Sequence, residues 1–284
     1  MKKIETIILN SFTDSIPGGN GAGVVLGLDF SNETMLKIAK KAGLSETAFI
    51  EQISDSTFKI RYFTPASEVD LCGHATIAAF WYLKDKLNSK NYKLKTKAGV
   101  VDINIGNIVT MSQTLPCYSE IIDKEEFLGC FEGLKKDDFF IDMPLQVVSS
   151  GLRDIIVPIR TLKGLFKAKP VVKRIIDISK KYNTIGVHLF TLETLNNSTA
   201  HTRNFAPLYD ITEEAATGTA NGALACYLYK YLKKFDFKNL VFEQGYCMNS
   251  PSAIFASLEA DNNQIKKVSV GGSAVLVKKI DIEI

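Results

Sequence analysis

The chain has 284 residues, of which 46% are hydrophobic and 23% are charged, a composition that is typical of globular proteins and excludes an intrinsically disordered chain. Lys and Arg number 34 and Asp and Glu 31, so the net charge of +3 is too small to indicate a nucleic-acid partner or an anionic membrane. We expect about two domains from this length. No apolar run approaches the roughly 18 residues of a membrane-spanning helix.

The N-terminal residues and the cysteines indicate a cytoplasmic protein. The first five residues, MKKIE, have neither the apolar stretch nor the cleavage site of a signal peptide. The five cysteines are odd in number, far apart and without a CxxC pair. This pattern is typical of free thiols in a reducing compartment.

In chain order, short runs rich in Val, Ile, Phe and Thr predict strands along the whole chain. In the first half they are 4–9, 23–26, 47–53, 57–63, 99–105 and 107–111. In the second half they are 145–149, 155–159, 186–191, 199–205, 240–244, 253–258 and 268–277. Helical spacing predicts helices over 33–42, 74–86, 124–134, 171–182 and 219–234. So many strands with so few helices exclude a regular βαβ alternation, and the predicted fold class is α+β with antiparallel sheets or barrels.

An internal repeat divides the chain into two related halves. The segments 61–65 and 203–207 both read R-x-F-x-P, and a glycine, Gly73 or Gly218, follows each of them. From those glycines the copies run in step, with Ala75 matching Ala220, Ala78 matching Ala223, Tyr82 matching Tyr227 and Leu83 matching Leu228. We therefore predict two similar domains, 1–118 and 119–274, with the final strand 275–284 returning to the first of them.

Each copy ends in a helix that is apolar nearly all round, which is typical of a buried helix. We expect each of these helices to fill the middle of its own domain. A helix N-terminus is a natural anion site, because its first N–H groups are unpaired and carry partial positive charge. The alternative is that Gly73 and Gly218 only permit tight turns.

Three residues of the first half are candidates for chemistry. Glu46 stands among small and apolar residues at the head of a strand, where burial raises the pKa of a carboxyl and suits it to proton transfer. The alternative is a surface carboxylate or a cap. Cys72 is either a nucleophile at a helix N-terminus or a packed structural thiol, and His74 is either a donor to an anion or a satisfied buried imidazole. With three histidines and no ligand spacing, we predict no metal site.

The second copy offers Glu214 and Thr219, which would suit an amine and a hydroxyl or carboxylate. The alternative is helix capping by Thr217 or Thr219, with acidic residues before the helix. The glycine-rich segment 18–23 is not a nucleotide-binding loop, because its spacing differs from G-x-G-x-x-G and a strand follows where a helix is required. A nucleophile elbow of the G-x-S-x-G type is also absent from the sequence.

Taken together, these motifs resemble the PhzF-like family, the phenazine-biosynthesis-type isomerases, which share the fold of diaminopimelate epimerases. The resemblance covers essentially the whole chain. Its marks are GNGAGVV at 19–25, SETAF at 45–49, RYFTP at 61–65, EVDLCGHAT at 68–76, ATGTA at 216–220, QG at 244–245 and VSVGG at 268–272. It implies two pseudo-symmetric β-barrel-like domains, each around a central helix, with the site between them. It also implies a homodimeric isomerase that needs no cofactor.

The resemblance also implies roles for individual residues. The catalytic glutamate of the family corresponds to Glu46, and the imidazole beside the substrate corresponds to His74. Glu214 and Thr219 would bind the substrate from the second loop, and the amides of Gly73 and Gly218 would hold its anionic group. The second loop of the family commonly reads E-D-P-A-T-G-S-A, whereas this chain has EEAATGTA, and Ser250 stands where the family commonly has arginine. These departures leave the substrate open.

Three functions remain as predictions. The leading one is an isomerase that moves a proton on a small carboxylate-bearing substrate through Glu46. A two-thiol racemase or epimerase would need a second opposed cysteine, but the residue that matches Cys72 in the repeat is Thr217. The third is a non-catalytic relative that binds a small carboxylate.

Overall fold

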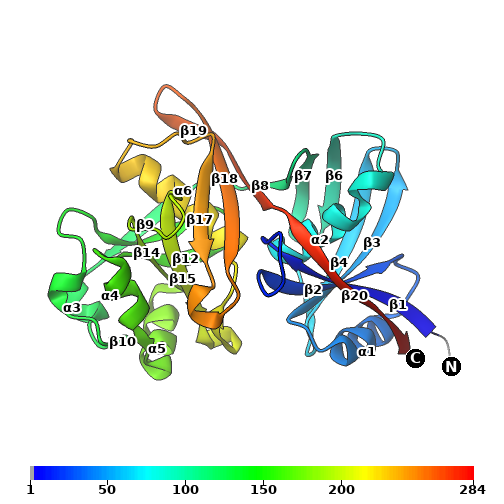
Figure 1. Ribbon diagram of the computed structural model, residues 1–284, viewed down its shortest axis with the longest axis horizontal. Coiled ribbons are helices and arrows are strands. Elements are labelled where there is room, and N and C mark those ends of the chain that lie inside the picture. Colours follow the sequence, from blue (N-terminus) through cyan, green and yellow to red (C-terminus); the bar gives the residue numbers. More distant parts are fainter. Residues whose placement is uncertain (1–2) are drawn as a thin grey trace. The chain divides into compact units, whose positions relative to one another are not determined.

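The computed structural model describes residues 3–284, which form two compact units. Unit 1 comprises residues 3–112 together with 271–284, and unit 2 comprises Gln113–Val270. Both units consist mainly of strands with a few helices, which confirms the α+β fold class (Figure 1). Within residues 3–284, no helix is long and apolar enough to span a membrane.

Unit 1 is built on one sheet. Its strands are β1 (Lys3–Ser11), β2 (Asn20–Leu26), β3 (Glu46–Ser54), β4 (Thr57–Phe63), β5 (Glu68–Val69), β6 (Asn91–Thr96), β7 (Gly99–Ile105), β8 (Val109–Gln113) and β20 (Ala274–Glu283). They pair in the order β20-β1-β2-β3-β4-β6-β7-β8, and β5 pairs with β4. The C-terminal strand β20 pairs antiparallel with β1 along its length, so the end of the chain lies in the same unit as its beginning.

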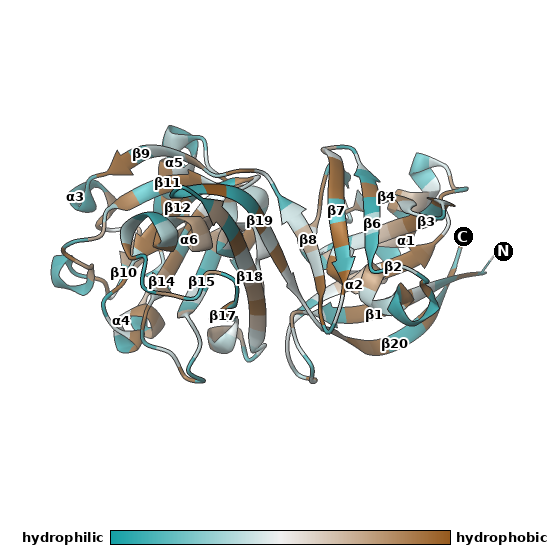
Figure 2. Ribbon diagram, turned by 90° about the horizontal axis from the view of Figure 1, so that it is seen from above, coloured by the Kyte–Doolittle hydropathy of each residue, from teal (hydrophilic) through white to brown (hydrophobic). Residues whose placement is uncertain are grey.

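Two helices belong to unit 1. Helix α1 (Asn32–Ala42) begins at Ser31, whose hydroxyl caps the first turn, and it buries Met35 and Ile38 against the sheet. Helix α2 (Gly73–Leu83) is buried continuously from His74 to Phe80 and contacts β1, β2, β3 and β20. An apolar helix of small residues is stable only where protein covers it on every side, and the sheet supplies that cover. Figure 2 shows hydrophobic and hydrophilic bands alternating along β7, as expected for a strand with one buried face.

Unit 2 repeats this plan around α6 (Gly218–Tyr231), which contacts β11, β12 and β18. Its main strands are β9 (Cys117–Ile122), β11 (Leu145–Ser149), β12 (Arg153–Pro158), β14 (Gly186–Thr191), β15 (Ala200–Ala206), β17 (Leu240–Gln244), β18 (Ser252–Asp261) and β19 (Gln264–Gly272). The pairing runs in that same order, with the short β16 (Ile211–Glu214) beside β15. The other elements of unit 2 are α3 (Lys124–Phe127), α4 (Leu162–Lys167), α5 (Val172–Tyr182), and the paired strands β10 (Phe131–Glu132) and β13 (Lys169–Pro170). Unit 2 also has 3₁₀ turns at Lys136–Asp138, Pro207–Tyr209 and Tyr246–Met248, and unit 1 has one at Lys84–Lys86.

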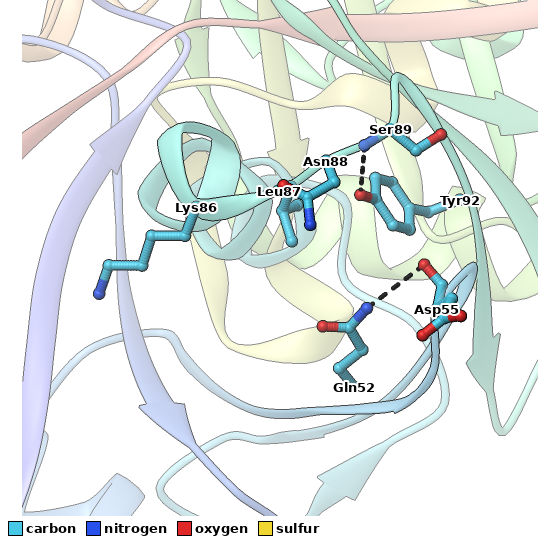
Figure 3. Close-up of a pocket in the computed structure, with 7 residues that line it drawn as sticks. All are labelled: Gln52, Asp55, Lys86, Leu87, Asn88, Ser89 and Tyr92. Atoms are coloured by element: carbon cyan, nitrogen blue, oxygen red, sulfur yellow. Dashed lines mark hydrogen bonds between the residues drawn. The ribbon is translucent and has the colours of Figure 1, made fainter.

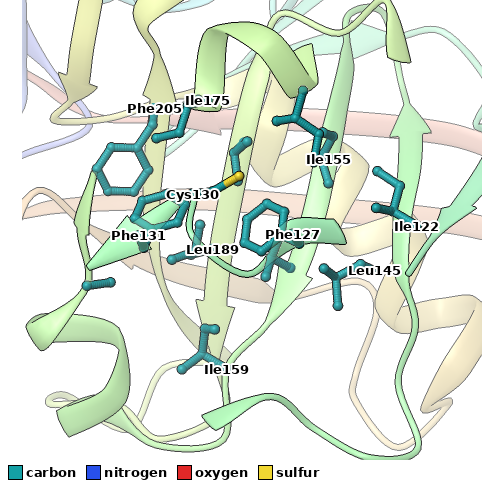
Figure 4. Close-up of a cluster of buried hydrophobic side chains, with 14 of the residues drawn as sticks. Ile122, Phe127, Cys130, Phe131, Leu145, Ile155, Ile159, Ile175, Leu189 and Phe205 are labelled. Carbon is teal, nitrogen blue, oxygen red and sulfur yellow. The ribbon is translucent and has the colours of Figure 1, made fainter. Parts of the chain in front are cut away.

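A second hydrophobic layer covers the other face of the unit 2 sheet. Figure 4 shows Leu145, Ile155, Leu189 and Phe205 from the strands packed with Ile175 from α5, and with side chains of the segment 122–131. The sheet of unit 2 is therefore buried on both faces, by α6 on one and by this layer on the other. Strands that are buried on both faces consist almost entirely of apolar residues, so a polar residue within one of them is a candidate for a specific role.

The predicted repeat appears as matching contacts in the two units. Arg61 makes a two-pronged ion pair with Glu68, and Arg203 makes the same pair with Glu213. Each guanidinium also lies over the phenylalanine of its own motif, at 5.1 Å and 4.9 Å from the ring centre. The R-x-F-x-P motif thus ties its strand to the short strand, β5 or β16, that leads to the central helix.

Two predicted elements are wrong. The helix predicted over 124–134 ends at Phe127, because Gly129 and Gly133 adopt positive φ values of 93° and 86° that a helix excludes. The single strand predicted over 268–277 is two strands, β19 and β20, which separate at Ser273. There the carbonyl of Ser273 accepts the N–H of Phe12 at 2.7 Å.

Candidate active site

The structure brings Glu46, Cys72 and His74 together in unit 1. Glu46 is the first residue of β3, Cys72 is the N-cap of α2, and His74 lies in the first turn of that helix. The Oε2 atom of Glu46 lies 3.2 Å from Nε2 of His74, and the Sγ atom of Cys72 lies 3.4 Å from Nδ1 of His74. The imidazole therefore has the carboxylate near one ring nitrogen and the thiol near the other.

His74 is held from several elements. Its backbone carbonyl accepts the hydroxyl of Ser11, 2.7 Å away on β1. The side chains of Asn20 and Ser45 lie 3.4 Å and 3.3 Å from Nδ1 and Nε2. Only 5% of the residue is exposed, whereas the Glu46 side chain keeps 16% of its surface accessible. The ring is thus fixed in place while the carboxylate beside it remains partly reachable.

The charge state of this cluster differs from the prediction. Burial is the largest single influence on Glu46 and pushes its pKa upward, but His74 and hydrogen bonds from Ser45 and Cys72 together hold the pKa below its usual value. The prediction of a raised pKa for Glu46 is therefore wrong. Burial lowers the pKa of His74, but Cys72 and Glu46 raise it well above 6.5 in total. Burial raises the pKa of the Cys72 thiol.

The directions of these pKa shifts favour the ionised form of Glu46 and the protonated form of His74. Glu46, Cys72 and His74 all influence one another's pKa, so their proton equilibria belong to the cluster rather than to one residue. A carboxylate in this state is ready to accept a proton, and the imidazolium can donate a hydrogen bond to an anion. The neutral thiol of Cys72 is the less reactive form of cysteine.

The same three side chains are a possible set of metal ligands. One oxygen, one sulfur and one nitrogen of Glu46, Cys72 and His74 lie within 4.8 Å of one another. Structural zinc sites use four protein ligands, and catalytic sites use three with an open position. Both nitrogens of His74 already contact other side chains of the cluster. The expected absence of a metal stays a prediction.

In unit 2, the Glu214 carboxylate contacts Thr217, the residue directly before α6. The Thr217 hydroxyl donates to Oε2 of Glu214, so Thr217 is the N-cap residue of α6 by position but does not cap with its side chain. The capping alternative is therefore wrong for Thr217. The Thr219 side chain is half-buried, and its backbone carbonyl accepts the Ser150 hydroxyl at 3.3 Å.

Five polar residues near Glu214 were missed from the sequence. They lie on strands β12, β14, β15 and β17 and on helix α6, and they are Asp154, His188, Asn204, Gln244 and Asn221. The strand register places His188 opposite Asn204 and Asn204 opposite Glu214, so these three side chains share the face of the sheet that α6 covers. The available signal was a polar residue within an otherwise apolar strand.

Asp154 is the buried carboxyl group of this set. It is 2% exposed. Burial, followed by the charge of Glu214, raises the pKa of Asp154 to about 7, against a smaller opposite effect of the Gly186 N–H. Unit 2 therefore contains a pair of interacting carboxyl groups, Asp154 and Glu214, that the sequence did not reveal.

A pocket of about 410 Å³ lies elsewhere in unit 1 (Figure 3). It is lined by Gln52, Asp55, Lys86, Leu87, Asn88, Ser89 and Tyr92. These residues surround the C-terminal end of α2, whereas Glu46 and His74 lie at its N-terminal end. Eleven helical residues span about 16 Å, so the pocket is separate from the cluster.

Known proteins resemble this chain over nearly its whole length. A sequence profile of the family described as phenazine biosynthesis-like protein (PhzC-PhzF) matches residues 9–279. An uncharacterised isomerase of Bacillus subtilis (strain 168) is 34% identical, over 97% of this chain and 97% of its own. The trans-2,3-dihydro-3-hydroxyanthranilate isomerase of Pseudomonas aeruginosa is 26% identical, over 94% of this chain and 95% of its own.

Solved structures give the same result. The crystal structure of a PhzF-family phenazine biosynthesis protein from Bacillus anthracis superposes with a TM-score of 0.92 at 30% identity and covers both chains completely. A probable proline racemase from Agrobacterium radiobacter, at 10% identity and a TM-score of 0.65, covers 99% of this chain and 93% of its own and shares the fold alone. Because the profile matches nearly the whole chain and the named relatives are isomerases, this chain belongs to the phenazine biosynthesis-like protein family of isomerases.

Proposed function

We propose that this isomerase moves a proton on a small carboxylate-bearing substrate, with Glu46 as its single acid/base group and without a cofactor. The observation that carries the proposal is the 3.2 Å contact between Oε2 of Glu46 and Nε2 of His74 at the start of α2. The lowered pKa of Glu46 means that it begins the reaction as a base. We therefore place proton abstraction by the Glu46 carboxylate before the return of the proton to the substrate.

In the first step the Glu46 carboxylate takes a proton from a substrate carbon, and the electron pair of that C–H bond enters the conjugated system of the substrate. In the second step the neutral Glu46 returns the proton to a different carbon, and a π electron pair forms the new C–H bond. Proton and charge are restored at the end. His74 donates a hydrogen bond to the substrate anion and stabilises the negative charge that develops between the steps.

Substrate binding is assigned to further residues of both units. We propose that the amides of Gly73 and Gly218 hold the anionic group, because each is the first residue of a buried helix. Glu214 would accept hydrogen bonds from an amine or hydroxyl, and Thr219 would contribute a hydroxyl. The compound named for the Pseudomonas aeruginosa relative carries a carboxylate, an amine and a hydroxyl on one ring, which makes it the first substrate to test.

The test is proton exchange into trans-2,3-dihydro-3-hydroxyanthranilate in heavy water, followed by NMR. The unsubstituted protein should incorporate deuterium as it converts the substrate. Glu46→Gln keeps the side-chain shape but cannot cycle a proton, so exchange should fall by about 10² to 10⁴. The matched control is Glu51→Gln, which changes an exposed glutamate on the same strand and should leave exchange unchanged. Full exchange by Glu46→Gln would refute the single-glutamate mechanism.

A thiol mechanism is the second candidate, because Cys72 contacts His74 at 3.4 Å. Such a mechanism uses one thiol as the base and an opposed thiol as the acid. The repeat places Thr217 at the position of the second thiol, and its hydroxyl is engaged with Glu214. The single-glutamate reading is therefore the stronger one.

We also expect a cytoplasmic homodimer, as the family resemblance implies. Sedimentation velocity of the purified full-length chain would give the mass of the particle directly. A mass near 31.4 kDa would contradict the dimer.

A further inference from the structure

Gln244 lies at the centre of a buried polar network in unit 2. It is the last residue of β17 and is fully buried. Its Oε1 atom accepts Nδ2 of Asn221 at 2.8 Å and the backbone N–H of Thr217 at 3.2 Å. Its Nε2 atom donates to the backbone carbonyl of Glu214 at 2.8 Å and to Oγ1 of Thr217 at 3.0 Å.

These partners fix the orientation of the Gln244 amide. The Thr217 N–H can only donate, and the Glu214 carbonyl can only accept. A flipped amide would place an N–H group against an N–H group and an oxygen against an oxygen, so one orientation satisfies both contacts. Oγ1 of Thr217 is therefore an acceptor toward Gln244, and its own hydrogen is directed to the Glu214 carboxylate.

The donors and acceptors that surround Asn221 and His188 are also fixed by their partners. The Asn221 amide nitrogen donates to Gln244 and to the Thr217 carbonyl, which leaves its oxygen facing Nε2 of His188 at 3.4 Å. Nδ1 of His188 accepts the Asn204 amide at 3.2 Å. Burial lowers the pKa of His188 to about 3, so the ring is neutral with its hydrogen on Nε2. A directed set of donors and acceptors thus supports the loop that carries Glu214.

We propose that Gln244 is a positioning residue for Glu214: it orients the Thr217 hydroxyl so that the hydroxyl hydrogen occupies one oxygen of Glu214 and holds this carboxylate as an acceptor for a substrate amine or hydroxyl. This inference rests on the proposed role of Glu214 in substrate binding. It identifies Gln244 and Thr217 as the residues that orient the Glu214 carboxylate.

The charged groups around Glu214 explain why the Thr217 hydroxyl matters for the protonation of this carboxylate. The charge of Glu214 contributes to the raised pKa of Asp154 on β12, so the like charges of these two groups favour protonation of the pair. The neighbouring Glu213 is paired with Arg203, and His188 stays neutral. A hydrogen bond to the ionised form opposes protonation. Without the Thr217 hydrogen, Glu214 should bind a proton more readily.

The test is a ¹³C NMR titration of protein labelled at the glutamate carboxyl carbons, with the Glu214 signal assigned by its loss in Glu214→Gln. Thr217→Val removes the hydroxyl with little change in shape, so the titration midpoint of Glu214 should rise by roughly one pH unit. Thr217→Ser retains the hydroxyl and should keep the midpoint. An unchanged midpoint in Thr217→Val would overturn the proposal. The experiment needs no substrate, so a failure of the proposed isomerisation would not alter its result.

A double-variant comparison tests whether Gln244 acts through Thr217. Gln244→Met should raise the Glu214 midpoint in the unsubstituted chain but add nothing in the Thr217→Val chain. The matched control is Gln146→Met, which changes another buried glutamine of unit 2 and should leave the midpoint in place. Equal shifts in both backgrounds would refute the route through Thr217.

A measurement on the unsubstituted protein covers the case in which Gln244→Met does not fold. The side-chain amide protons of Gln244 should exchange slowly with water and show nuclear Overhauser effects to the Thr217 methyl group. Rapid exchange without these contacts would also overturn the proposal.

Discussion

The starts of α2 and α6 are built alike but present different chemistry. Thr76 bonds back to the carbonyl of Cys72 at 2.7 Å, and Asn221, its match in the repeat, bonds back to the carbonyl of Thr217 at 2.9 Å. The helix starts are therefore equivalent in backbone geometry. Around α2 lie a thiol, an imidazole and a carboxylate, whereas around α6 lie a hydroxyl, two amides and a carboxylate.

The layer beneath each helix differs as well. In unit 1, Tyr62 reaches Thr76 directly, with 2.5 Å between their oxygens. In unit 2, the residue that matches Tyr62 in the R-x-F-x-P motif is Asn204, which is too short to do this, and His188 bridges Asn204 to Asn221. Tyr62 alone makes the connection in unit 1 that Asn204 and His188 make together in unit 2.

The position of the carboxyl group separates the two units most clearly. Glu46 lies two residues before Ala48, which pairs with Tyr62, and Gly186 lies two residues before His188, which pairs with Asn204. Gly186 is thus the match of Glu46, but a Cβ atom there would lie 2.0 Å from the Phe205 carbonyl oxygen. The buried acid comes instead from Asp154, which pairs with Gly186 on the adjacent strand. One backbone plan therefore places a carboxyl group at a different position in each unit.

The largest expected effect separates Glu46 from Glu214. With trans-2,3-dihydro-3-hydroxyanthranilate as substrate, Glu46→Gln should lower kcat by about 10² to 10⁴, because the proton carrier is lost. Glu214→Gln should mainly raise KM, because it removes a binding contact. Steady-state kinetics of both variants measure the difference. A loss of kcat confined to Glu214→Gln would reverse the roles of the two units.

The two arginine–glutamate pairs should differ in their contribution to stability. Arg203 is 6% exposed and also donates to the carbonyls of Leu165 and Ala168, whereas the Arg61 side chain is 19% exposed. Arg203→Ala should therefore cost about 3–5 kcal/mol of unfolding free energy, because it leaves buried acceptors and Glu213 unpaired.

The matched change Arg61→Ala should cost about 1 kcal/mol, since water can replace the lost partner. Urea unfolding of the two variants gives both values. Equal losses would mean that exposure does not distinguish the two pairs.

Asp154 predicts a pH dependence that unit 1 does not share. Its pKa is about 7 in the folded chain against an ordinary 3.8, so the folded state binds this proton more tightly than the unfolded state does. The stability that the proton contributes is present below pH 3.8 and is lost as the pH rises to about 7. Asp154→Asn, which cannot ionise, should gain up to about 4 kcal/mol relative to the unsubstituted protein across that window.

Urea unfolding at a series of pH values measures this relative stability. Asp85→Asn is the control for a general loss of one acidic group. A difference between Asp154→Asn and the unsubstituted protein that stays constant with pH would show that Asp154 titrates normally.

The smallest expected effect concerns the thiol. Cys72→Ala should lower the exchange rate by less than about tenfold, because it removes a neighbour of His74 but leaves the Glu46 carboxylate in place. Thr217→Cys would supply a second thiol at the matching position, and it should not restore exchange to Glu46→Gln. Restored exchange in that double variant would favour the two-thiol mechanism.

Much of the fold was accessible from the sequence. The R-x-F-x-P repeat and the two apolar helices are carried by short motifs, and the structure contains both. Such features can be predicted because hydrophobic periodicity and local motifs act over a few residues. The helix predicted over 124–134 failed at the same local level, since two glycines in positive φ outweighed the apolar spacing. The roles of Glu46 and His74 were implied by the family resemblance, and the two side chains meet only through the packing of β3 against α2.

The tertiary structure alone decided the charge state and the polar network of the site. The net pKa of Glu46 depends on whether burial or His74 prevails, and that balance depends on distances between β3 and α2. Asp154 approaches Glu214 only because four strands pair in one register, across 60 residues of chain. Electrostatic and hydrogen-bond energies fall steeply with distance and depend on orientation. Sequence supplied the groups, and their energies were set where folding brought distant segments together.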